Sequence, residues 1–434
     1  MKLFSEMIGR GISPDVHTFS ILIDAICKEG MVKKAQKLFD LIIERGVEPD
    51  TITYNALMEG YCLHRKLDEA ENVLHSMVVR GCEPNVISYS ILINGYCKAK
   101  KLDEAMQIFE DMRSNGLPGD VITYTSIIDG LCKVGRVAAA QELFMEMQAR
   151  GPSPNVYTYS AIIDGLCVCS LGMWEDVESY VNKMVNSGVS PDVVTFGIMI
   201  DAFCKDGNTE KAQTLLKLMS TRSVSPDVVT YNSLIDGLCK SGQWKEAMKL
   251  FSEMIGRGIS PDVHTFSILI NGYCKAKKLD EAMQIFEDMR SNGLPGDVIT
   301  YTSIIDGLCK VGKVAAAQEL FMEMQARGPS PNVYTYSAII DGLCKDKQIP
   351  KAQNLFEEMI CKGVARDVFT YSSIIQGVCN LGMWEDVESY VNKMVNSGVS
   401  PDVVTFSIMI DALCKDGKTE KAQTLLKLMS TRSV

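Results

Sequence analysis

Apolar residues recur along this chain of 434 residues with a period of 35, from one end to the other. In the stretch 228–262, the first group of apolar residues has the i, i+3, i+4, i+7, i+8 spacing of one helix face. This group comprises Tyr231, Leu234, Ile235, Leu238 and Cys239. A second group at helical spacing follows, and it comprises Trp244, Ala247, Leu250, Phe251 and Met254. Each period is therefore predicted to contain two amphipathic helices.

Residues that start and stop helices stand between these groups. Thr230 lies just before the first group, and because a Ser or Thr occupies this place in all twelve units, it is predicted to be the N-cap. Ser241 and Gly242 separate the two helices, and Gly258 with Pro261 beyond it ends the second one. Each unit is therefore expected to form a helical hairpin.

A single hairpin of this kind cannot bury both of its apolar faces, so neighbouring hairpins must stack into one continuous array. The predicted fold class is all-α, an α-solenoid superhelix of helix-turn-helix repeats, and these residues leave its handedness open. Residues 1–434 are interpreted as a single array, with a partial repeat at 1–15, eleven full repeats over 16–402 and an incomplete final repeat at 403–434. The fifth full repeat holds two extra residues near Cys169.

Composition and motifs narrow the function classes. No apolar run approaches the roughly 20 residues of a membrane span, and the first residues lack a signal-peptide pattern. Twelve of the 15 cysteines share one place in the repeat, so buried, reduced thiols are predicted there. The spacing of Cys167 and Cys169 is only a weak metal signal, and no histidine joins them in a ligand spacing. Without a nucleophile, a phosphate-binding loop or a metal constellation, the chain is predicted to be no enzyme and to hold no cofactor or metal.

The first helix carries a polar line beside its buried face, because residues three and four apart share a face. In 228–262 this line contains Val229, Asn232, Asp236 and Lys240. The lysine recurs, as candidates for binding a phosphate backbone, at Lys28, Lys98, Lys133, Lys205, Lys240, Lys275, Lys310, Lys345 and Lys415. The alternative is that the lysine forms an i,i+4 ion pair with the acid before it, as Lys240 would with Asp236, which stabilises the helix by on the order of a few tenths of a kcal/mol. The net charge of -10 does not exclude phosphate binding, because charges act locally within a Debye length of about 8 Å.

Two further places in the repeat are polar, restricted and variable. The fifth residue of each unit is Ser20, Asn55, Ser90, Thr125, Ser160, Gly197, Asn232, Ser267, Thr302, Ser337, Ser372 or Ser407. The last residue is Asp50, Asn85, Asp120, Asn155, Asp192, Asp227, Asp262, Asp297, Asn332, Asp367 or Asp402. An ionised Asp only accepts hydrogen bonds, whereas an Asn amide also donates. Asp therefore suits the ring N–H of G or U, and Asn suits the bare ring nitrogen of A or C. The alternative is that Pro-Asp and Pro-Asn are simply turn residues.

The repeat unit, with VVTYNSLIDGLCK, then EAMKLF, a Gly and a closing Pro-Asp, resembles the pentatricopeptide repeat over essentially the whole chain. The 34-residue tetratricopeptide repeat fits worse in period and signature. The motif LIDGLCK is similar to the repeats of the plant restorer-of-fertility-like branch, which belongs to the uniform 35-residue class.

The resemblance implies a right-handed superhelix that binds single-stranded RNA, one base per repeat, parallel to the protein. It implies that the fifth and last residues of each repeat read the base. It also implies that the second residue of each repeat wedges between successive bases, namely His17, Ile52, Ile87, Ile122, Tyr157, Val194, Val229, His264, Ile299, Tyr334, Phe369 and Val404.

The family code assigns G to Ser or Thr with Asp, A to Thr with Asn, U to Asn with Asp, and C or U to Asn with Asn. Applied to the eleven full repeats, this code predicts the target 5'-G-(C/U)-G-A-G-N-U-G-A-G-G-3', where N marks the repeat with Gly197. The polarity argument from the residues covers only the last position of each pair. Residues 93–167 recur at 270–344 with a single change, Arg136 to Lys313, so the two Thr-Asn repeats are copies of each other.

Members of the family act mostly in mitochondria or chloroplasts, on the stability, processing or translation of particular transcripts. We therefore expect a mitochondrial protein, with a chloroplast protein as the alternative. Leu3, Phe4 and Met7 lack the first helix of their hairpin, which indicates a fragment of a longer protein without its targeting segment and with ends that self-associate. A different function stays open, a protein-binding scaffold that uses the same face. Mobility shifts with single-stranded RNA against duplex RNA and DNA distinguish the two.

Overall fold

The structure is a computed structural model that describes residues 9–10, 14–169 and 174–431. These residues form 24 helices, α2 to α25, and no strand. The predicted all-α solenoid of helical hairpins is therefore confirmed. No helix among these residues has the length and apolar character to cross a bilayer. Leu3, Phe4 and Met7 lie outside the described residues.

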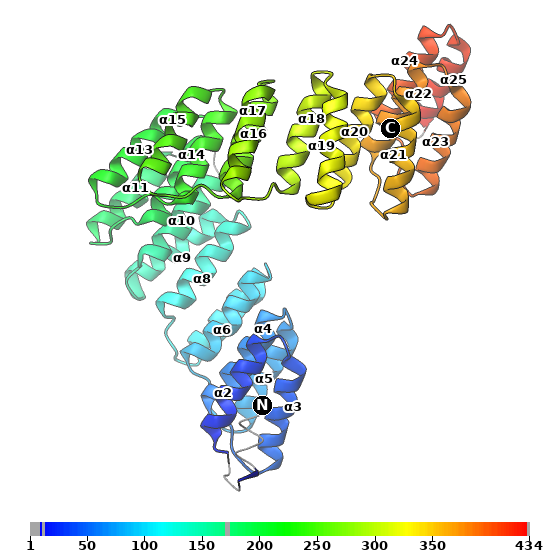
Figure 1. Cartoon of the computed structure of the whole chain (residues 1–434). Coiled ribbons are helices and arrows are strands. Elements are labelled where there is room, and N and C mark those ends of the chain that lie inside the picture. Colours follow the sequence, from blue (N-terminus) through cyan, green and yellow to red (C-terminus); the bar gives the residue numbers. More distant parts are fainter. Residues whose placement is uncertain (1–8, 11–13, 170–173, 432–434) are drawn as a thin grey trace. The chain divides into compact units, whose positions relative to one another are not determined.

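The first helices of the repeats pack one on the next and are the even-numbered ones. They are α2 (Val16–Lys28), α4 (Thr51–Leu63), α6 (Val86–Lys98), α8 (Val121–Lys133), α10 (Val156–Cys169), α12 (Val193–Lys205), α14 (Val228–Lys240), α16 (Val263–Lys275), α18 (Val298–Lys310), α20 (Val333–Lys345), α22 (Val368–Asn380) and α24 (Val403–Lys415). The second helices are α3 (Val32–Glu44), α5 (Leu67–Val79), α7 (Leu102–Ser114), α9 (Val137–Arg150), α11 (Trp174–Asn186), α13 (Thr209–Thr221), α15 (Trp244–Gly256), α17 (Leu279–Ser291), α19 (Val314–Arg327), α21 (Ile349–Cys361), α23 (Trp384–Asn396) and α25 (Thr419–Thr431). Figure 1 shows successive hairpins lying side by side within each part of the chain.

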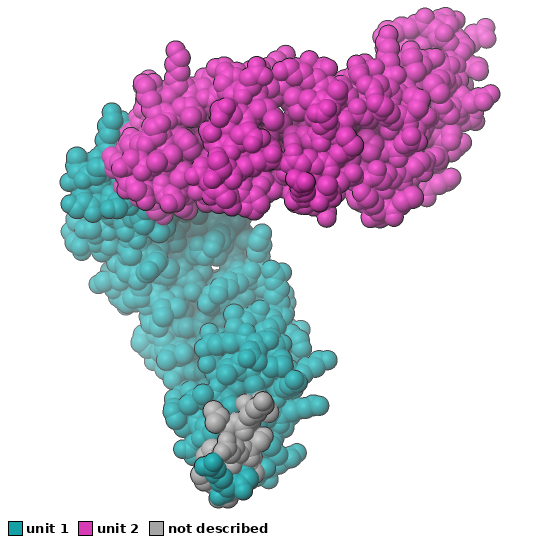
Figure 2. Space-filling view, viewed as in Figure 1, with its two compact units in different colours: residues 1–206, 214–225 teal, residues 207–213, 226–434 magenta. Residues whose placement is uncertain are grey.

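Two compact units divide the repeats (Figure 2). The first consists of residues 1–206 and 214–225, and the second of residues 207–213 and 226–434. Within each unit, consecutive even-numbered helices contact each other, and the even-numbered helices other than α12 contact their hairpin partners. These contacts confirm the stacking of hairpins inside each unit.

The prediction of the N-cap is wrong by three residues. Thr230 lies at the third position inside α14, and the cap is Asp227, whose Oδ1 accepts the Thr230 backbone N–H at 2.8 Å. The same arrangement repeats at the other described caps of the even-numbered helices, with Asp or Asn as the capping residue. Both residue types are good caps, but a carboxylate at the helix N-terminus also gains from the helix dipole.

Glycines in the left-handed region end the helices as predicted. Gly242 and Gly258 have φ values of +75° and +77°, a conformation that costs glycine little. At the place of Gly242, four repeats instead carry a residue with a side chain at positive φ, namely Arg65, Lys100, Lys277 and Lys347. The turn between the two helices therefore keeps the left-handed conformation even where glycine is replaced.

Two kinds of contact recur between consecutive hairpins. An aromatic ring of a second helix packs edge-to-face on the tyrosine of the following first helix, as in Phe321 and Tyr336 with centroids 5.3 Å apart. The first helices approach each other at a glycine, because a Cβ on Gly342 would lie only 2.7 Å from the Cβ of Cys309. Glycine at this place therefore sets the spacing between consecutive repeats.

The repeated cysteines are free thiols that mostly lie at these glycine contacts, and nine of them are buried. Cys62 and Cys167 are half-buried, and Cys414 is exposed. Burial raises the pKa of the Cys344 thiol to about 12, so it stays protonated. The prediction of buried, reduced thiols is confirmed for nine of the twelve places; Cys62, Cys167 and Cys414 are the exceptions.

Candidate nucleic-acid interface

The last residue of each repeat does two things at once. Its Oδ1 caps the next helix by accepting both the backbone N–H and the hydroxyl of the Thr or Ser three residues later, as Asp50 does from Thr53 at 2.9 and 2.7 Å. Asn155 uses its carbonyl Oδ1 in the same way toward Thr158, at 3.1 Å for both bonds. Because the cap requires an acceptor, the amide must turn its Nδ2 away from the helix. The cap therefore leaves an acceptor, Oδ2, at each Asp and a donor, Nδ2, at each Asn.

The fifth residue of most repeats lies next to this cap and is buried or half-buried. Ser337 is only 2% exposed, and its hydroxyl lies 2.6 Å from the hydroxyl of Thr370, which caps onto Asp367. Ser90 bonds Thr123 in the same way at 2.7 Å. Equivalent bonds join the fifth position to the following third position for Ser20, Thr125, Ser160, Ser267, Thr302 and Ser372. The structure thus brings each of these predicted pairs together through one intervening hydroxyl.

Four fifth positions depart from this arrangement. Asn55 accepts from Ser88 through its Oδ1, at 2.8 Å. Asn232 donates its Nδ2 directly to Asp262 at 3.4 Å, and its own Oδ1 is buried without a partner among the described residues. Ser407 is exposed and donates to the Val403 carbonyl. Gly197 belongs to the first compact unit and Asp227 to the second.

The second residue of each repeat is exposed in all twelve repeats, although most of these side chains are apolar. Tyr157 is 68% exposed, Ile122 63% and Val229 62%. The remaining members, which are also exposed, are His17, Ile52, Ile87, Val194, His264, Ile299, Tyr334, Phe369 and Val404. An exposed side chain at the same place in every repeat, apolar in ten of the twelve, is typical of an interaction surface.

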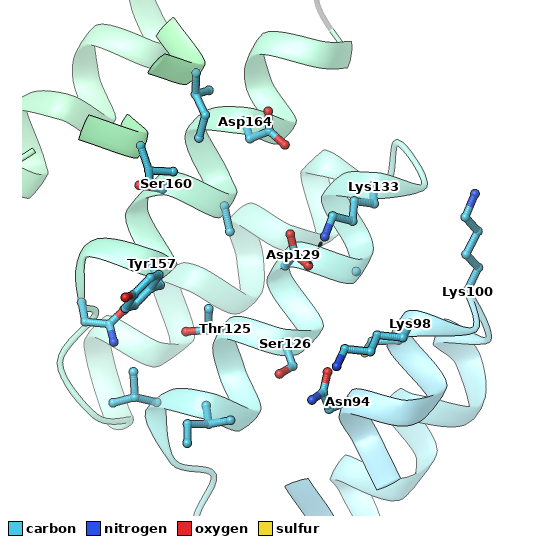
Figure 3. Close-up of a pocket in the computed structure, with 18 residues that line it drawn as sticks. Asn94, Lys98, Lys100, Thr125, Ser126, Asp129, Lys133, Tyr157, Ser160 and Asp164 are labelled. Atoms are coloured by element: carbon cyan, nitrogen blue, oxygen red, sulfur yellow. Dashed lines mark hydrogen bonds and ion pairs between the residues drawn. The ribbon is translucent and has the colours of Figure 1, made fainter. Parts of the chain in front are cut away.

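A hollow of about 650 Å³ joins these positions in the first compact unit (Figure 3). Ile122, Tyr157 and Val194, from three consecutive second positions, line it together with the pair Thr125 and Asn155. Figure 3 shows Thr125 on α8 and Tyr157 on the neighbouring helix α10. The copied segment forms a hollow of about 340 Å³ in the second unit, lined by the equivalent pair Thr302 and Asn332. The two copies of the duplicated segment thus form equivalent hollows, one in each unit.

The lysine row is exposed but largely neutralised. Lys133 lies 2.6 Å from Asp129, and the same i,i+4 ion pair forms at Lys28, Lys205, Lys240, Lys310, Lys345 and Lys415. Lys98 and Lys275 have an Asn four residues earlier, and neither forms an ion pair with a described residue. The predicted ion pair is confirmed in seven repeats, whereas a role of these lysines toward phosphate stays a prediction.

An acid without an ion-pair partner among the described residues, Asp164, lies on the same surface as the lysine row. Asp164 has Val168 four residues later in place of a lysine, and it forms no ion pair with a described residue (Figure 3). Burial and the nearby Asp129 carboxylate raise the pKa of Asp164. At Asp262, by contrast, hydrogen bonds from Thr265 and Asn232 outweigh burial and lower the pKa of the carboxyl. The Asp262 carboxylate is thus held ionised, whereas Asp164 lies near a second carboxylate, Asp129, on the same surface.

The repeat pattern of the PPR repeat family matches residues 1–28, 22–62, 49–98, 86–133, 119–168, 167–205, 191–240, 226–275, 268–310, 296–345, 337–380 and 366–415, and a further PPR repeat matches 404–434. The chain belongs to the PPR repeat family. Comparison of this PPR chain with curated proteins finds no match.

Among solved structures, this PPR chain is similar to PPR10 from maize, with 23% identity over 99% of this chain and 76% of that one, at a TM-score of 0.42. It is also similar to yeast Rmd9p in complex with a 16-nucleotide target RNA, with 12% identity over 95% of this chain and 90% of that one, at a TM-score of 0.43. Membership of the family rests on the repeat matches and not on these two structures.

The third-position Ser or Thr is recognisable in the sequence, where its pattern predicts an N-cap. Its hydroxyl instead lies between the fifth residue and the last residue of the preceding repeat, as the Thr53 hydroxyl does between Ser20 and Asp50. Among the described residues, no group of three or more His, Cys, Asp or Glu side chains is arranged to hold a metal ion. The side chain of Cys169 lies outside the described residues.

Proposed function

We propose that this PPR protein binds single-stranded RNA in a sequence-specific manner, one base per repeat, at the surface formed by the second, fifth and last residues. The observation that carries the proposal is the cap. It commits Oδ1 of every described Asp or Asn and leaves Oδ2 or Nδ2 for a ligand. Acceptors then face the ring N–H of G or U, and donors face the ring nitrogen of A or C. The polarity argument from sequence thereby gains a physical basis.

The exposed second positions support the same function. A base that enters between two such side chains, for example Ile122 and Tyr157, contacts apolar or aromatic surface on both faces. Base stacking on such side chains contributes about 1–3 kcal/mol per base. Because these contacts are indifferent to sequence, selectivity is left to the fifth and last residues. The proposed target is 5'-G-(C/U)-G-A-G-N-U-G-A-G-G-3'.

An exchange of one pair tests the proposal. Asn232→Thr combined with Asp262→Asn gives repeat 228–262 the pair found in the two Thr-Asn repeats. We expect the preference at the seventh base to move from U to A by about 5- to 100-fold, and the preferences at the other bases to stay unchanged. The assay is a mobility shift at fixed salt with RNAs that differ only at that base. A protein-binding scaffold would show no change at any base, and that result would refute the proposal.

We also propose that the RNA is an organellar transcript whose stability, processing or translation the protein controls, in mitochondria rather than chloroplasts. The support is the resemblance of LIDGLCK and its neighbours to restorer-of-fertility-like repeats. Crosslinking of the expressed protein in isolated organelles, followed by sequencing of the bound RNA, tests both parts. Recovery of nuclear or cytosolic transcripts alone would contradict them.

A further inference from the structure

A proton count shows what the fifth residue offers in the repeats that end in Asp. Thr300 donates its single hydroxyl proton to the Asp297 carboxylate, at 2.7 Å. In the 2.7 Å contact between Ser267 and Thr300, Ser267 must therefore be the donor. The Ser267 hydroxyl also lies 2.8 Å from the Val263 carbonyl, so its one proton is committed to the protein in either case. Ser267 can only accept a hydrogen bond from a ligand.

In the repeat that carries Asn55 and Asn85, the same count of protons leaves hydrogen-bond donors for a ligand instead of an acceptor. The Ser88 backbone N–H occupies Oδ1 of Asn85, at 3.1 Å. The Ser88 hydroxyl lies closer to Oδ1 of Asn55, at 2.8 Å, than to Oδ1 of Asn85, at 3.2 Å. An uncharged amide oxygen is a weaker acceptor than a carboxylate, so it does not draw the proton as Asp does. Ser88 thus engages both amide oxygens, and the polar groups left to the pair are two Nδ2 donors.

We propose that the third-position hydroxyl is a positioning residue that fixes which hydrogen-bonding groups each reading pair offers, and that through Ser88 the second repeat selects cytosine. Two neighbouring donors require two neighbouring acceptors. On the Watson–Crick edges, only cytosine has them, at N3 and O2. Uracil places an N–H between two carbonyls and therefore opposes a donor with a donor. This inference rests on the proposed RNA binding and decides the base that the family code leaves as C or U.

The other Asn at the fifth position provides a comparison within the chain. Asn232 is followed by Asp262, and its Nδ2 donates to the carboxylate directly. Thr265 gives its hydroxyl proton to the same Oδ1 of Asp262, at 2.9 Å, and is therefore not available to hold Oδ1 of Asn232. This pair offers one acceptor, Asp262 Oδ2, beside an amide donor, which matches the N–H and carbonyl of uracil. An Asn at the fifth position therefore offers different groups to a ligand, depending on which acceptor receives the proton of the third-position hydroxyl.

The test measures affinity for four 11-nucleotide RNAs that carry A, C, G or U at the second base, with the unchanged protein, Ser88→Ala and Ser88→Thr. We expect the unchanged protein to prefer C over U by about 10-fold or more. Ser88→Ala frees the Asn55 amide to rotate, so the C/U ratio should fall at least about threefold. Ser88→Thr keeps the hydroxyl and should keep the ratio. The preference at the third base, read by Ser90 and Asp120, is the internal control and should be the same in all three proteins.

Each outcome bears on a separate statement. If the unchanged protein binds its target better than a scrambled RNA but takes U as tightly as C, the inference is wrong and the proposed function stands. If it does not discriminate at any base, both are wrong. If Ser88→Ala keeps the full preference for C, the hydroxyl has no positioning role. Because Ser88 is fully buried, circular dichroism must first show that the Ala variant retains its helices. The ratio in the unchanged protein decides between C and U whether or not that variant folds.

Discussion

The closest approach between repeats can be tested by adding one methyl group. Gly342 of α20 faces Cys309 of α18, and a Cβ there would overlap the Cys309 Sγ and lie 2.7 Å from its Cβ. Gly342→Ala must therefore push the two helices apart by a few tenths of an ångström. Overpacking of this kind costs about 1–3 kcal/mol. Replacing a helical glycine by alanine returns up to about 1 kcal/mol. The expected net effect is a destabilisation of about 0–3 kcal/mol.

A matched control separates these two contributions. Gly256 is also helical, and a Cβ there would meet nothing within 4 Å. Gly256→Ala should therefore stabilise the protein by up to about 1 kcal/mol, which places the two variants about 1–3 kcal/mol apart. Ala202 and Ala412 occupy the place of Gly342 in two other repeats, so the substitution is compatible with folding.

Guanidinium unfolding followed by circular dichroism measures this difference, and hydrogen exchange in α18 and α20 locates it. Adding Cys309→Gly removes the atoms that the new methyl group meets, so Gly342→Ala should cost less in that background. If Gly342→Ala and Gly256→Ala change the stability equally, the glycines do not set the repeat spacing, and the reasoning fails.

Three further predictions concern charge and the thiols. Within the lysine row, only Lys98 and Lys275 lack an ion-pair partner among the described residues. If this row makes the phosphate contacts, the salt slope of RNA binding should be about 1–2, whereas nine free lysines would give about 6; a titration of Kd against salt distinguishes these values. Asp164→Asn should tighten RNA binding by removing an unpaired anion from the surface, and it should abolish a pH dependence. Because the pKa of Asp164 is raised above 3.8, the unchanged protein should gain affinity as the pH falls toward that raised value, and equal pH profiles of Kd for both proteins would contradict this. Maleimide at pH 8 should label the exposed thiols of Cys361 and Cys414 quickly. The buried thiols, such as Cys344 with a pKa of about 12, should react only after unfolding, and rapid labelling of any buried thiol would contradict the packing.

Much of the fold follows from spacing alone. The apolar stripe from Tyr231 to Cys239 lies in one helix, Val228–Lys240, and the second stripe lies in Trp244–Gly256. A period of 35 residues with two such stripes leaves only a stacked hairpin as a way to bury both. Gly242 and Gly258 adopt the left-handed conformation that the breaks require. These features are local, and local patterns determine them.

The cap and the bridging hydroxyl could not be predicted in the same way. Asp227 and Thr230 are both common N-caps, and the helical pattern does not distinguish residues three apart at its start. The bond from Ser20 to Thr53 joins residues 33 positions apart, so it depends on how closely two first helices approach. That distance is set by the glycine beside the cysteine, which is a packing effect. The pairing of Lys133 with Asp129 and the missing partner of Asp164 follow from the spacing, but the burial of Asp164 beside the Asp129 carboxylate depends on how two helices pack.

Affinity for the predicted RNA tests the central claim most directly. The measurement compares 5'-GCGAGAUGAGG-3' with a scrambled RNA of the same composition, at one salt concentration, by fluorescence anisotropy. Fixed composition and salt hold the electrostatic contribution constant, so any difference reflects the reading pairs. The account predicts that the ordered sequence binds at least about 100-fold tighter, since several mismatches at about 1–3 kcal/mol each separate the two RNAs. Equal affinity for both RNAs would contradict the claim that the paired fifth and last residues read bases.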